Sequence, residues 1–211
     1  MKTALSFLLT AIAAMTVGCG QAASSNSQDD TSVRQATENA SQNEPTGQME
    51  HKNGTVQISF PFVRQDRIAS NQFAVWIEDM DGTFVKTLFA TQFVASGGYE
   101  QRPEAIPDWV ERSGLNNGTA SGIDAVTGAT PDTGTLQFSW DCTDSEGNPL
   151  PEGEYRFLVE AAVSWDSRVV YEGTIGIGGA EHLAAASAEG SGEAAEGQNM
   201  IGDVTAAYTP R

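Results

Sequence analysis

The stretch "TLQFSWDCTDSEGNPLPEGEYRFLVEAAV", residues 135–163, decides the fold class of this chain. Apolar and polar residues alternate in its first and last parts, and this period of two is typical of half-buried β-strands. The alternation places two sets of side chains each on one face: Leu136, Phe138 and Trp140 before the turn, and Tyr155, Phe157, Val159, Ala161 and Val163 after it. Between them, "DSEGNPLPEG" supplies the Gly, Asn and Pro residues that a tight reversal requires.

The same alternation recurs on both sides of this stretch. "TVQISFPF" at 55–62 and "QFAVWIED" at 72–79 predict two more half-buried strands, and "DMDG" at 79–82 predicts a turn. Further strands are expected at 84–90, 92–95, 169–177 and 203–208, whereas the small and acidic residues of 180–198 predict a mobile loop. Roughly seven or eight short strands without a convincing helix predict an all-β, immunoglobulin-like antiparallel β-sandwich, with a barrel as the alternative.

The N-terminus predicts export. "ALSFLLTAIAAMTV", residues 4–17, is too short an apolar run to span a bilayer and predicts a signal peptide over residues 1–18. "TVGC" resembles a bacterial lipobox, although Thr16 stands where leucine is usual. The resemblance implies that Cys19 receives lipid and anchors the chain outside the cytoplasm, in the periplasm or at the cell surface. The alternative is a plain secretory peptide with an incidental cysteine.

A polar segment follows the cysteine. Residues 19–54 are nearly free of large apolar side chains, so they cannot bury enough surface to offset the entropy lost on ordering. We therefore expect a disordered tether over 19–54 and one β-sandwich domain over 55–211.

Charge and composition exclude several classes of function. The net charge is -17 and no cluster of Lys or Arg is present, which argues against a nucleic-acid partner. His51 and His182 have no cysteine or carboxylate at metal spacing, so no metal site is expected. With histidine this sparse no nucleophile, base and acid can be assembled, and the chain is not expected to be an enzyme on its own.

Three smaller sets of polar residues have structural interpretations. If Cys19 is lipidated, Cys142 has no partner for a disulfide, and we expect it to be buried beside Trp140. The other two sets look like fragments of calcium loops but stand where hairpin turns are expected, so we assign them to turn chemistry: Asp79 with Asp81, and Asp141 with Thr143 and Asp144.

Two family resemblances rest on quoted motifs. "WDCTDSEGNPLPEGEYRFLVEA" is similar to a hairpin of immunoglobulin-like repeats, including that of the flagellar hook-capping protein. Together with "AVWIEDMDGTFVKTL" and "DAVTGATPDTG", it makes residues 55–208 resemble an uncharacterised family of predicted periplasmic proteins, a domain of unknown function. This resemblance implies a fold and a compartment.

A shorter motif implies chemistry. The pattern Asp-x-x-(Ser/Thr)-Gly-Ala-Thr is similar to the site at which a periplasmic flavin transferase joins FMN to threonine in FMN-binding subunits of sodium-pumping NADH:quinone reductases. Every defined position is matched: Asp124, Thr127, Gly128, Ala129 and Thr130. The resemblance implies covalent FMN on the Thr130 hydroxyl, with a flavin transferase and membrane redox proteins as partners.

The residues around this motif agree with such a role. Gly128 and Ala129 present little bulk to another enzyme's active site, and Pro131 favours an extended Thr130 with its side chain outward. Asp124 would position the loop or help to bind the transferase. The Thr-Ser pair that often follows the motif is replaced here by Pro131 and Asp132, so the alternative is an ordinary turn that leads into the next strand.

A long segment leads up to the motif. Residues 97–134 contain no confident strand, and so long a loop within a compact domain is usually functional or disordered. Trp109 would either stack on the isoalloxazine ring of FMN or pin the loop onto the sandwich. The leading hypothesis is therefore a lipid-anchored FMN carrier, and the alternative is a periplasmic binding or assembly lipoprotein without flavin.

Overall fold

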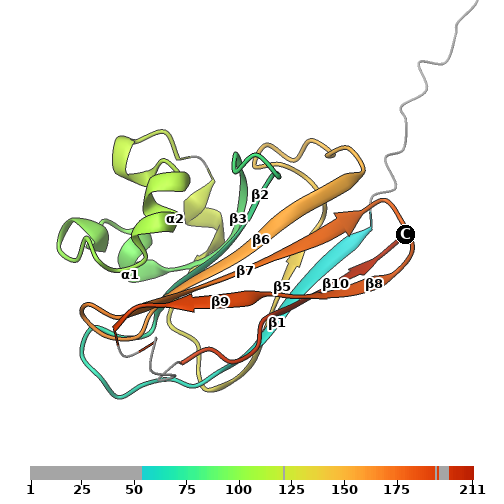
Figure 1. Ribbon diagram of the computed structural model, residues 1–211. Helices are drawn as coiled ribbons and strands as arrows, with labels where there is room; N and C mark the ends of the chain where they lie inside the picture. The colour runs from blue at the N-terminus through green and yellow to red at the C-terminus, as the bar shows by residue number, and fades with distance from the viewer. Residues whose placement is uncertain (1–53, 121, 193, 195–199) are drawn as a thin grey trace, which may run out of the picture. The chain divides into compact units, whose positions relative to one another are not determined.

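A computed structural model describes residues 54–211 except 121, 193 and 195–199, and it confirms the predicted all-β sandwich. The signal peptide, Cys19, His51 and the tether up to residue 53 lie outside the described residues. Two sheets pack face to face around one apolar core (Figure 1). Short helices and turns between β3 and β5 cover the outer face of one sheet.

The smaller sheet has four strands and is antiparallel throughout. Its order is β5-β1-β10-β8. The strands are β1 (Thr55–Phe62), β5 (Gly134–Trp140), β8 (His182–Ala185) and β10 (Thr205–Thr209).

The larger sheet has six strands in the order β4-β3-β2-β6-β7-β9. Its strands are β2 (Gln72–Glu78), β3 (Phe84–Thr91), β4 (Thr127–Gly128), β6 (Gly153–Ala162), β7 (Arg168–Ile177) and β9 (Ser187–Gly190). All neighbours are antiparallel except β3 and β4, which are parallel.

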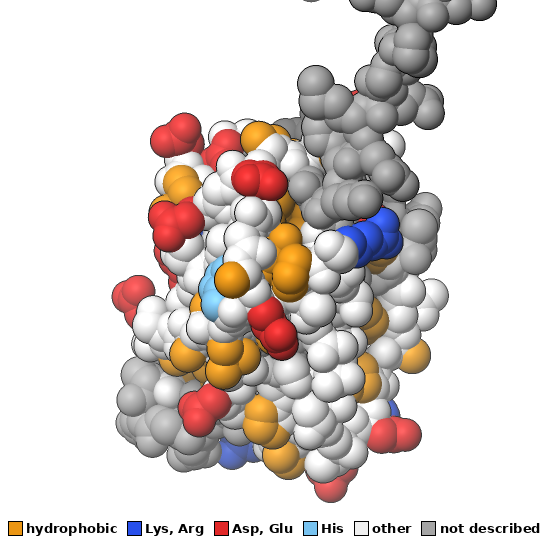
Figure 2. Space-filling model, turned by 90° about the vertical axis from the view of Figure 1, so that its right-hand side faces the viewer, with side chains coloured by type: hydrophobic (Ala, Val, Ile, Leu, Met, Phe, Trp, Pro, Cys, Tyr) orange, Lys and Arg blue, Asp and Glu red, His pale blue; other side chains and the backbone are white. Residues whose placement is uncertain are grey.

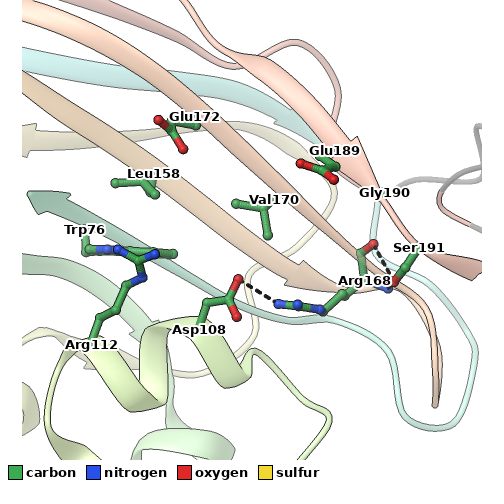
Figure 3. A pocket seen from close by; sticks show the side chains of 10 residues that line it. All are labelled: Trp76, Asp108, Arg112, Leu158, Arg168, Val170, Glu172, Glu189, Gly190 and Ser191. Atoms are coloured by element: carbon green, nitrogen blue, oxygen red, sulfur yellow. Dashed lines mark hydrogen bonds and ion pairs between the residues drawn. The ribbon is translucent and has the colours of Figure 1, made fainter. Parts of the chain in front are cut away.

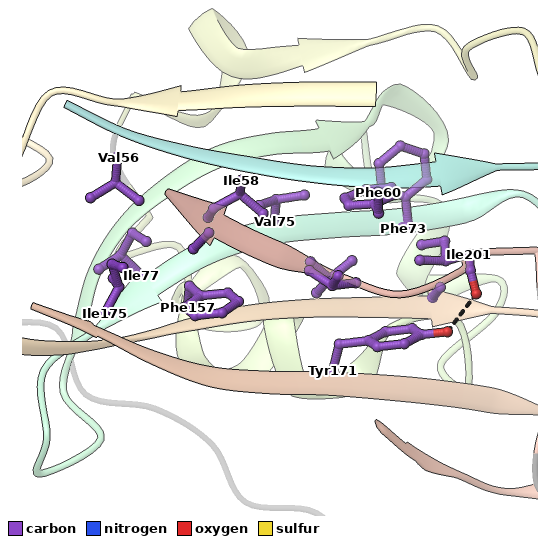
Figure 4. Close-up of a cluster of buried hydrophobic side chains, with 14 of the residues drawn as sticks. Val56, Ile58, Phe60, Phe73, Val75, Ile77, Phe157, Tyr171, Ile175 and Ile201 are labelled. Carbon is purple, nitrogen blue, oxygen red and sulfur yellow. Dashed lines mark hydrogen bonds between the residues drawn. The ribbon is translucent and has the colours of Figure 1, made fainter. Parts of the chain in front are cut away.

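The core between the sheets is rich in aromatic rings. Figure 4 shows Val56, Ile58 and Phe60 of β1 facing Phe73, Val75 and Ile77 of β2. All six side chains are at most 1% exposed, and burying each one contributes about 1.5–3 kcal/mol. The Tyr171 hydroxyl donates a 2.5 Å hydrogen bond to the Ile201 carbonyl at one end of this core (Figure 4).

The connection at 140–155 joins the two sheets. β5 and β6 lie in different sheets, so the predicted hairpin is instead a crossover turn. The Trp140 Nε1–H donates to the Thr143 carbonyl at 2.8 Å, and the Tyr155 hydroxyl donates to the Pro151 carbonyl at 2.9 Å. The Trp140 and Tyr155 rings meet edge to face with centroids 5.3 Å apart. These aromatic side chains therefore brace the turn that holds the sheets together.

The aspartate-rich segments form turns, as predicted. Asp79 Oδ1 accepts hydrogen bonds from the Asp81 and Thr83 N–H groups, and β2 and β3 pair across this turn. Asp144 Oδ1 accepts from the Glu146 and Asn148 N–H groups in the same way. The Thr83 N–H lowers the pKa of Asp79, and the Asn148 side-chain amide, together with backbone donors, lowers the pKa of Asp144, since these groups stabilise the ionised form.

Cys142 is buried beside Trp140, as predicted. Burial raises the pKa of its thiol to about 11, so the thiol is protonated at neutral pH. The backbone of Cys142 has a positive φ of 57°, which belongs to the tight start of the crossover turn.

Two local predictions are wrong. Residues 92–95 form the helical turn α1 (Gln92–Ala95), because β3 ends at Thr91 and the chain there folds over the sheet. Within 180–198, predicted as a mobile loop, β8 and β9 add to the edges of the two sheets. Neither strand carries an alternating apolar pattern, and both are held by backbone pairing to a neighbouring strand.

The segment that precedes β5 contains helical structure instead of a plain loop. It consists of α1, η1 (Gly98–Glu100), α2 (Pro107–Arg112), η2 (Leu115–Asn117), η3 (Ile123–Val126) and β4. This covering segment, residues 92–128, buries a second apolar cluster against the outer face of β2, β3 and β6, with Trp76, Trp109 and Leu158 among its members. β2 and much of β6 are thus buried on both faces, not half-buried as predicted.

The acidic side chains are dispersed over the outer surface. In the face shown in Figure 2, Asp and Glu side chains are spread apart and Lys or Arg side chains are few. No helix within the described residues has the length and apolar character needed to cross a membrane.

We expect Tyr155→Phe to lower the free energy of unfolding by about 1–2 kcal/mol, because the Pro151 carbonyl loses its hydrogen-bond donor inside a braced turn. Chemical denaturation of the two proteins measures this difference.

Tyr99→Phe is the matched control. It removes the same hydroxyl, whose hydrogen bond to the Leu115 carbonyl is longer at 3.3 Å, so its effect should be smaller. Equal effects of the two substitutions would contradict the bracing role of Tyr155.

Candidate functional site

The Thr130 motif lies where the chain passes between the two sheets. Thr127 and Gly128 form β4, which pairs in parallel with Ala90 and Thr91 of β3. β4 is one edge strand of the six-stranded sheet, and β5, which begins at Gly134, is one edge strand of the four-stranded sheet. Residues 129–133 therefore cross the open side of the sandwich from one sheet edge to the other (Figure 1).

Gly128 has a packing reason to be glycine. A Cβ at this position would lie 2.9 Å from Cε2 of Phe89. That ring cannot move aside easily, because it stacks on Phe73 with centroids 5.0 Å apart and an interplanar angle of 29°. The motif backbone is consequently held close against β3.

The hydroxyl of Thr130 has no hydrogen-bond partner among the residues that the structure describes. Its side chain is partly buried, whereas Ala129 beside it is exposed. Thr130 is thus less exposed than the sequence suggested. Thr127 is also partly buried and takes part in an interaction of its own. The backbone of Asp124 lies in η3, four residues before β4 ends, and its side chain is outside the described structure.

Arg64 fastens the far end of the crossing. Its backbone N–H donates to Thr133 Oγ1 at 3.0 Å, and its guanidinium forms a 3.4 Å ion pair with Asp132. The pair is exposed and contributes little energy by itself. The crossing is nevertheless attached at both ends, by β4 pairing on one side and by the β1–β2 connection on the other.

Trp109 does not join this site. It is fully buried in the second apolar cluster, and its Nε1–H donates to Thr87 Oγ1 at 3.0 Å. Its indole has no exposed surface on which a flavin could stack. Of its two predicted roles, the structure supports the one that pins the covering segment onto the sheet.

A buried carboxylate that the sequence analysis missed holds the start of α2. Glu160, on the outer face of β6, has no exposed side-chain surface. It accepts hydrogen bonds from the N–H groups of Trp109 at 2.9 Å and Asp108 at 3.4 Å. Arg168 completes the arrangement with contacts of 2.5 Å to Glu160 and 2.8 Å to Asp108. Because Ile106 at the N-cap makes no side-chain capping bond, the Glu160 carboxylate of β6 caps this helix instead.

A second buried carboxylate holds the end of the same helix. Glu78, the last residue of β2, is fully buried. Its oxygens lie 2.9 Å from Arg112 Nη1 of α2 and 3.0 Å from Arg156 Nη1 of β6, and the Trp76 Nε1–H donates to it at 2.8 Å. α2 is therefore clamped onto the sheet at both ends through charged groups.

A pocket of about 280 Å³ opens beside this clamp (Figure 3). Its walls are α2 on one side and the end of β9 on the other, over a floor of side chains from β2, β6 and β7. Ten residues line it: Trp76, Asp108, Arg112, Leu158, Arg168, Val170, Glu172, Glu189, Gly190 and Ser191. The pocket thus combines apolar side chains with both arginines and carboxylates.

Burial raises the pKa of Glu160 to about 7, and the Asp108 carboxylate adds to the rise. The Trp109 N–H and Arg168 act in the opposite direction without cancelling the effect of burial.

One sequence signal could have revealed that the outer face of the sheet is covered: "FAVWI" is apolar at consecutive positions, which is typical of a strand buried on both faces.

Comparison with known proteins identifies a family. The family described as "Predicted periplasmic protein (DUF2271)" matches residues 53–196, which is more than half of the chain, so the chain belongs to this family. The match spans the motif and both buried carboxylates and supports an extracytoplasmic location. No curated protein and no solved structure gives a significant match.

The raised pKa of Glu160 predicts a pH dependence of stability. The folded state holds this proton more tightly than the unfolded state, whose pKa is the ordinary 4.5, so the contribution is complete below about pH 4.5 and is lost as the pH rises through about 7. We expect Glu160 to lower the free energy of unfolding by up to about 3 kcal/mol across this window. Urea denaturation at pH 5 and pH 8 measures it.

Glu160→Gln is the control, because the amide has nearly the same shape and does not titrate. Its free energy of unfolding should change less between pH 5 and pH 8 than that of the wild type. An identical change in both proteins would show that Glu160 does not titrate in this window.

Proposed function

We propose that this chain is a lipid-anchored, extracytoplasmic carrier of covalent FMN, with the flavin on Thr130, in a membrane-associated electron-transfer system. The observation that carries the proposal is the place of the Thr130 hydroxyl. It ends a motif matched at every defined position, it has no hydrogen-bond partner in the described structure, and it lies on a crossing between two sheet edges.

The surroundings of Thr130 fit a phosphoester-linked group. Gly128 keeps the backbone close to β3, and the exposed Ala129 leaves room for a second protein to approach. Attachment at both ends of the crossing would hold the hydroxyl in one place while a transferase binds.

We assign the attachment step to a separate enzyme, because the motif supplies the nucleophile and its resemblance to flavinylation sites implies a transferase. A flavin transferase would take FMN from FAD. The Thr130 oxygen forms a bond to the FMN phosphorus, the bond to the AMP phosphate breaks, AMP leaves, and the hydroxyl proton passes to a base of the transferase. Bound FMN accepts and donates electrons, and this chain positions it between membrane redox partners.

Lipid on Cys19 would keep the carrier at the membrane surface. The segment between Cys19 and β1 is polar and would let the sandwich move between an electron donor and an acceptor while it stays near both.

A second candidate function is supported by the pocket beside α2. Its mixed lining of arginines, carboxylates and apolar side chains suits a periplasmic binding or assembly lipoprotein that carries no flavin.

Co-expression with a periplasmic flavin transferase should give a yellow protein whose added mass is that of FMN less one water, located on the peptide that contains Thr130. Thr130→Val should stay colourless and folded, because a methyl group of similar size replaces the hydroxyl. Intact-mass and peptide mass spectrometry measure the modification, and circular dichroism measures the fold.

Two further variants are the controls. Thr127→Val should keep at least part of the modification, and Asp124→Ala should lower its yield without moving the site. If the wild type stays colourless while the same transferase modifies a known substrate, the carrier proposal fails and the binding lipoprotein replaces it.

Expression in a bacterium should label the protein with fatty acid and bring it into the membrane fraction, whereas Cys19→Ala should abolish the labelling. Metabolic labelling and membrane fractionation measure this outcome. Wild-type protein recovered without lipid in the soluble periplasmic fraction would contradict the anchor.

A further inference from the structure

A shallow hollow lies beside α1, next to the motif. Its volume is about 400 Å³, and its lining residues are Gln92, Phe93, Ser96, Gly98 and Gln101. α1 starts directly after the end of β3, the strand with which β4 pairs, and it lies against β4. The hollow and the Thr130 crossing are therefore neighbours at one edge of the six-stranded sheet.

Phe93 gives the hollow an apolar wall. Its side chain is 41% exposed although the residue sits on a helix with two buried neighbours, Val94 and Ala95. The ring rests on Gly98, where a Cβ would lie 2.6 Å from its Cε1 atom. Glycine at that position lets the ring lie flat against the backbone while part of its surface faces solvent.

The other side chains of the hollow offer hydrogen bonds. Gln92, Ser96 and Gln101 are exposed, and their side chains have no hydrogen-bond partner among the described residues. Two amides and a hydroxyl provide both donors and acceptors, with no formal charge. An uncharged, partly apolar ring with polar edges would match this lining.

We propose that the hollow beside α1 holds the isoalloxazine ring of the FMN attached to Thr130, with the ring against Phe93 and its polar edge toward Gln92 and Gln101. This inference rests on the proposed function. The ribityl phosphate provides a flexible link between the ring and the hydroxyl, so a nearby surface is favoured over a distant one by effective concentration. A ring held in this way would present a constant edge to its redox partners.

The other exposed apolar surface at this end of the sandwich is less suited. Ile68 is 82% exposed and Trp165 is 53% exposed. Arg102 contacts both segments: its Nη2 donates to the Ala69 carbonyl at 2.8 Å, and its guanidinium lies 5.2 Å from the centroid of the Trp165 ring. Trp165 lies in the β6–β7 turn. Because β3 and β2 lie between β4 and β6, the strands β4 and β6 are about 14 Å apart across the sheet.

The test uses the full chain after modification by the transferase. Intact mass first establishes that FMN is attached, and iodide quenching of flavin fluorescence and fluorescence anisotropy then measure how accessible and how mobile the ring is. The wild type should be quenched several-fold less by iodide than free FMN. Phe93→Ala should bring quenching close to that of free FMN and lower the anisotropy, whereas the control Trp165→Ala should change neither.

The outcomes separate the two proposals. A protein without added mass contradicts the carrier function itself. Added mass together with quenching equal to that of free FMN leaves the carrier intact and overturns the hollow. An increase of quenching in Trp165→Ala but not in Phe93→Ala would place the ring on the other surface. If Phe93→Ala does not fold or accept FMN, Gln92→Ala with Gln101→Ala replaces it, and unchanged quenching in that variant overturns the proposal.

Discussion

Burial of Glu78 and Glu160 on the outer face of the six-stranded sheet is the constraint on which the placement of the covering segment, residues 92–128, depends. A carboxylate removed from water is costly unless charged partners and hydrogen-bond donors surround it. Here the partners come from three places: arginines of β6 and β7, an arginine at the end of α2, and the N–H groups at its start. Removing one partner of such a buried pair typically costs about 3–5 kcal/mol, so α2 has one favourable position on the sheet.

The position of α2 in turn places the motif. The covering segment leaves the sheet at the end of β3, crosses its outer face through α1 and α2, and returns to the edge of β3 as β4. The return brings β4 parallel to β3, and Gly128 lets the two backbones come close beside the Phe89 ring. After β4 the chain crosses to β5 in the other sheet, and Thr130 lies on that crossing. The carrier function and the hollow beside α1 that we propose both use this edge, at some distance from the charged pocket by α2.

The sandwich as a whole provides a rigid support for this edge. Its aromatic core and the braced turn at 140–155 keep the two sheets in a fixed relation, and a crossing between sheet edges takes its geometry from that relation. Such a support suits a protein that positions a chemical group and leaves the chemistry to the group itself. Membership of a family of predicted periplasmic proteins agrees with the exported, acidic character of the chain.

The sequence alone determined the sandwich, most of its long strands, the aspartate turns and the burial of Cys142, because alternation and turn chemistry are local properties that each segment carries with it. It also contained the Thr130 motif, as a resemblance. Tertiary structure alone decided that 92–95 is helical, that β8 and β9 pair at the edges, and that β4 exists, since segments of only two to four residues owe their form to neighbours distant in sequence. It likewise decided that Trp109 is an anchor and that Glu160 caps a helix from another strand. A side chain's environment depends on which face of a sheet is covered, and here a segment folded back from elsewhere in the chain covers it.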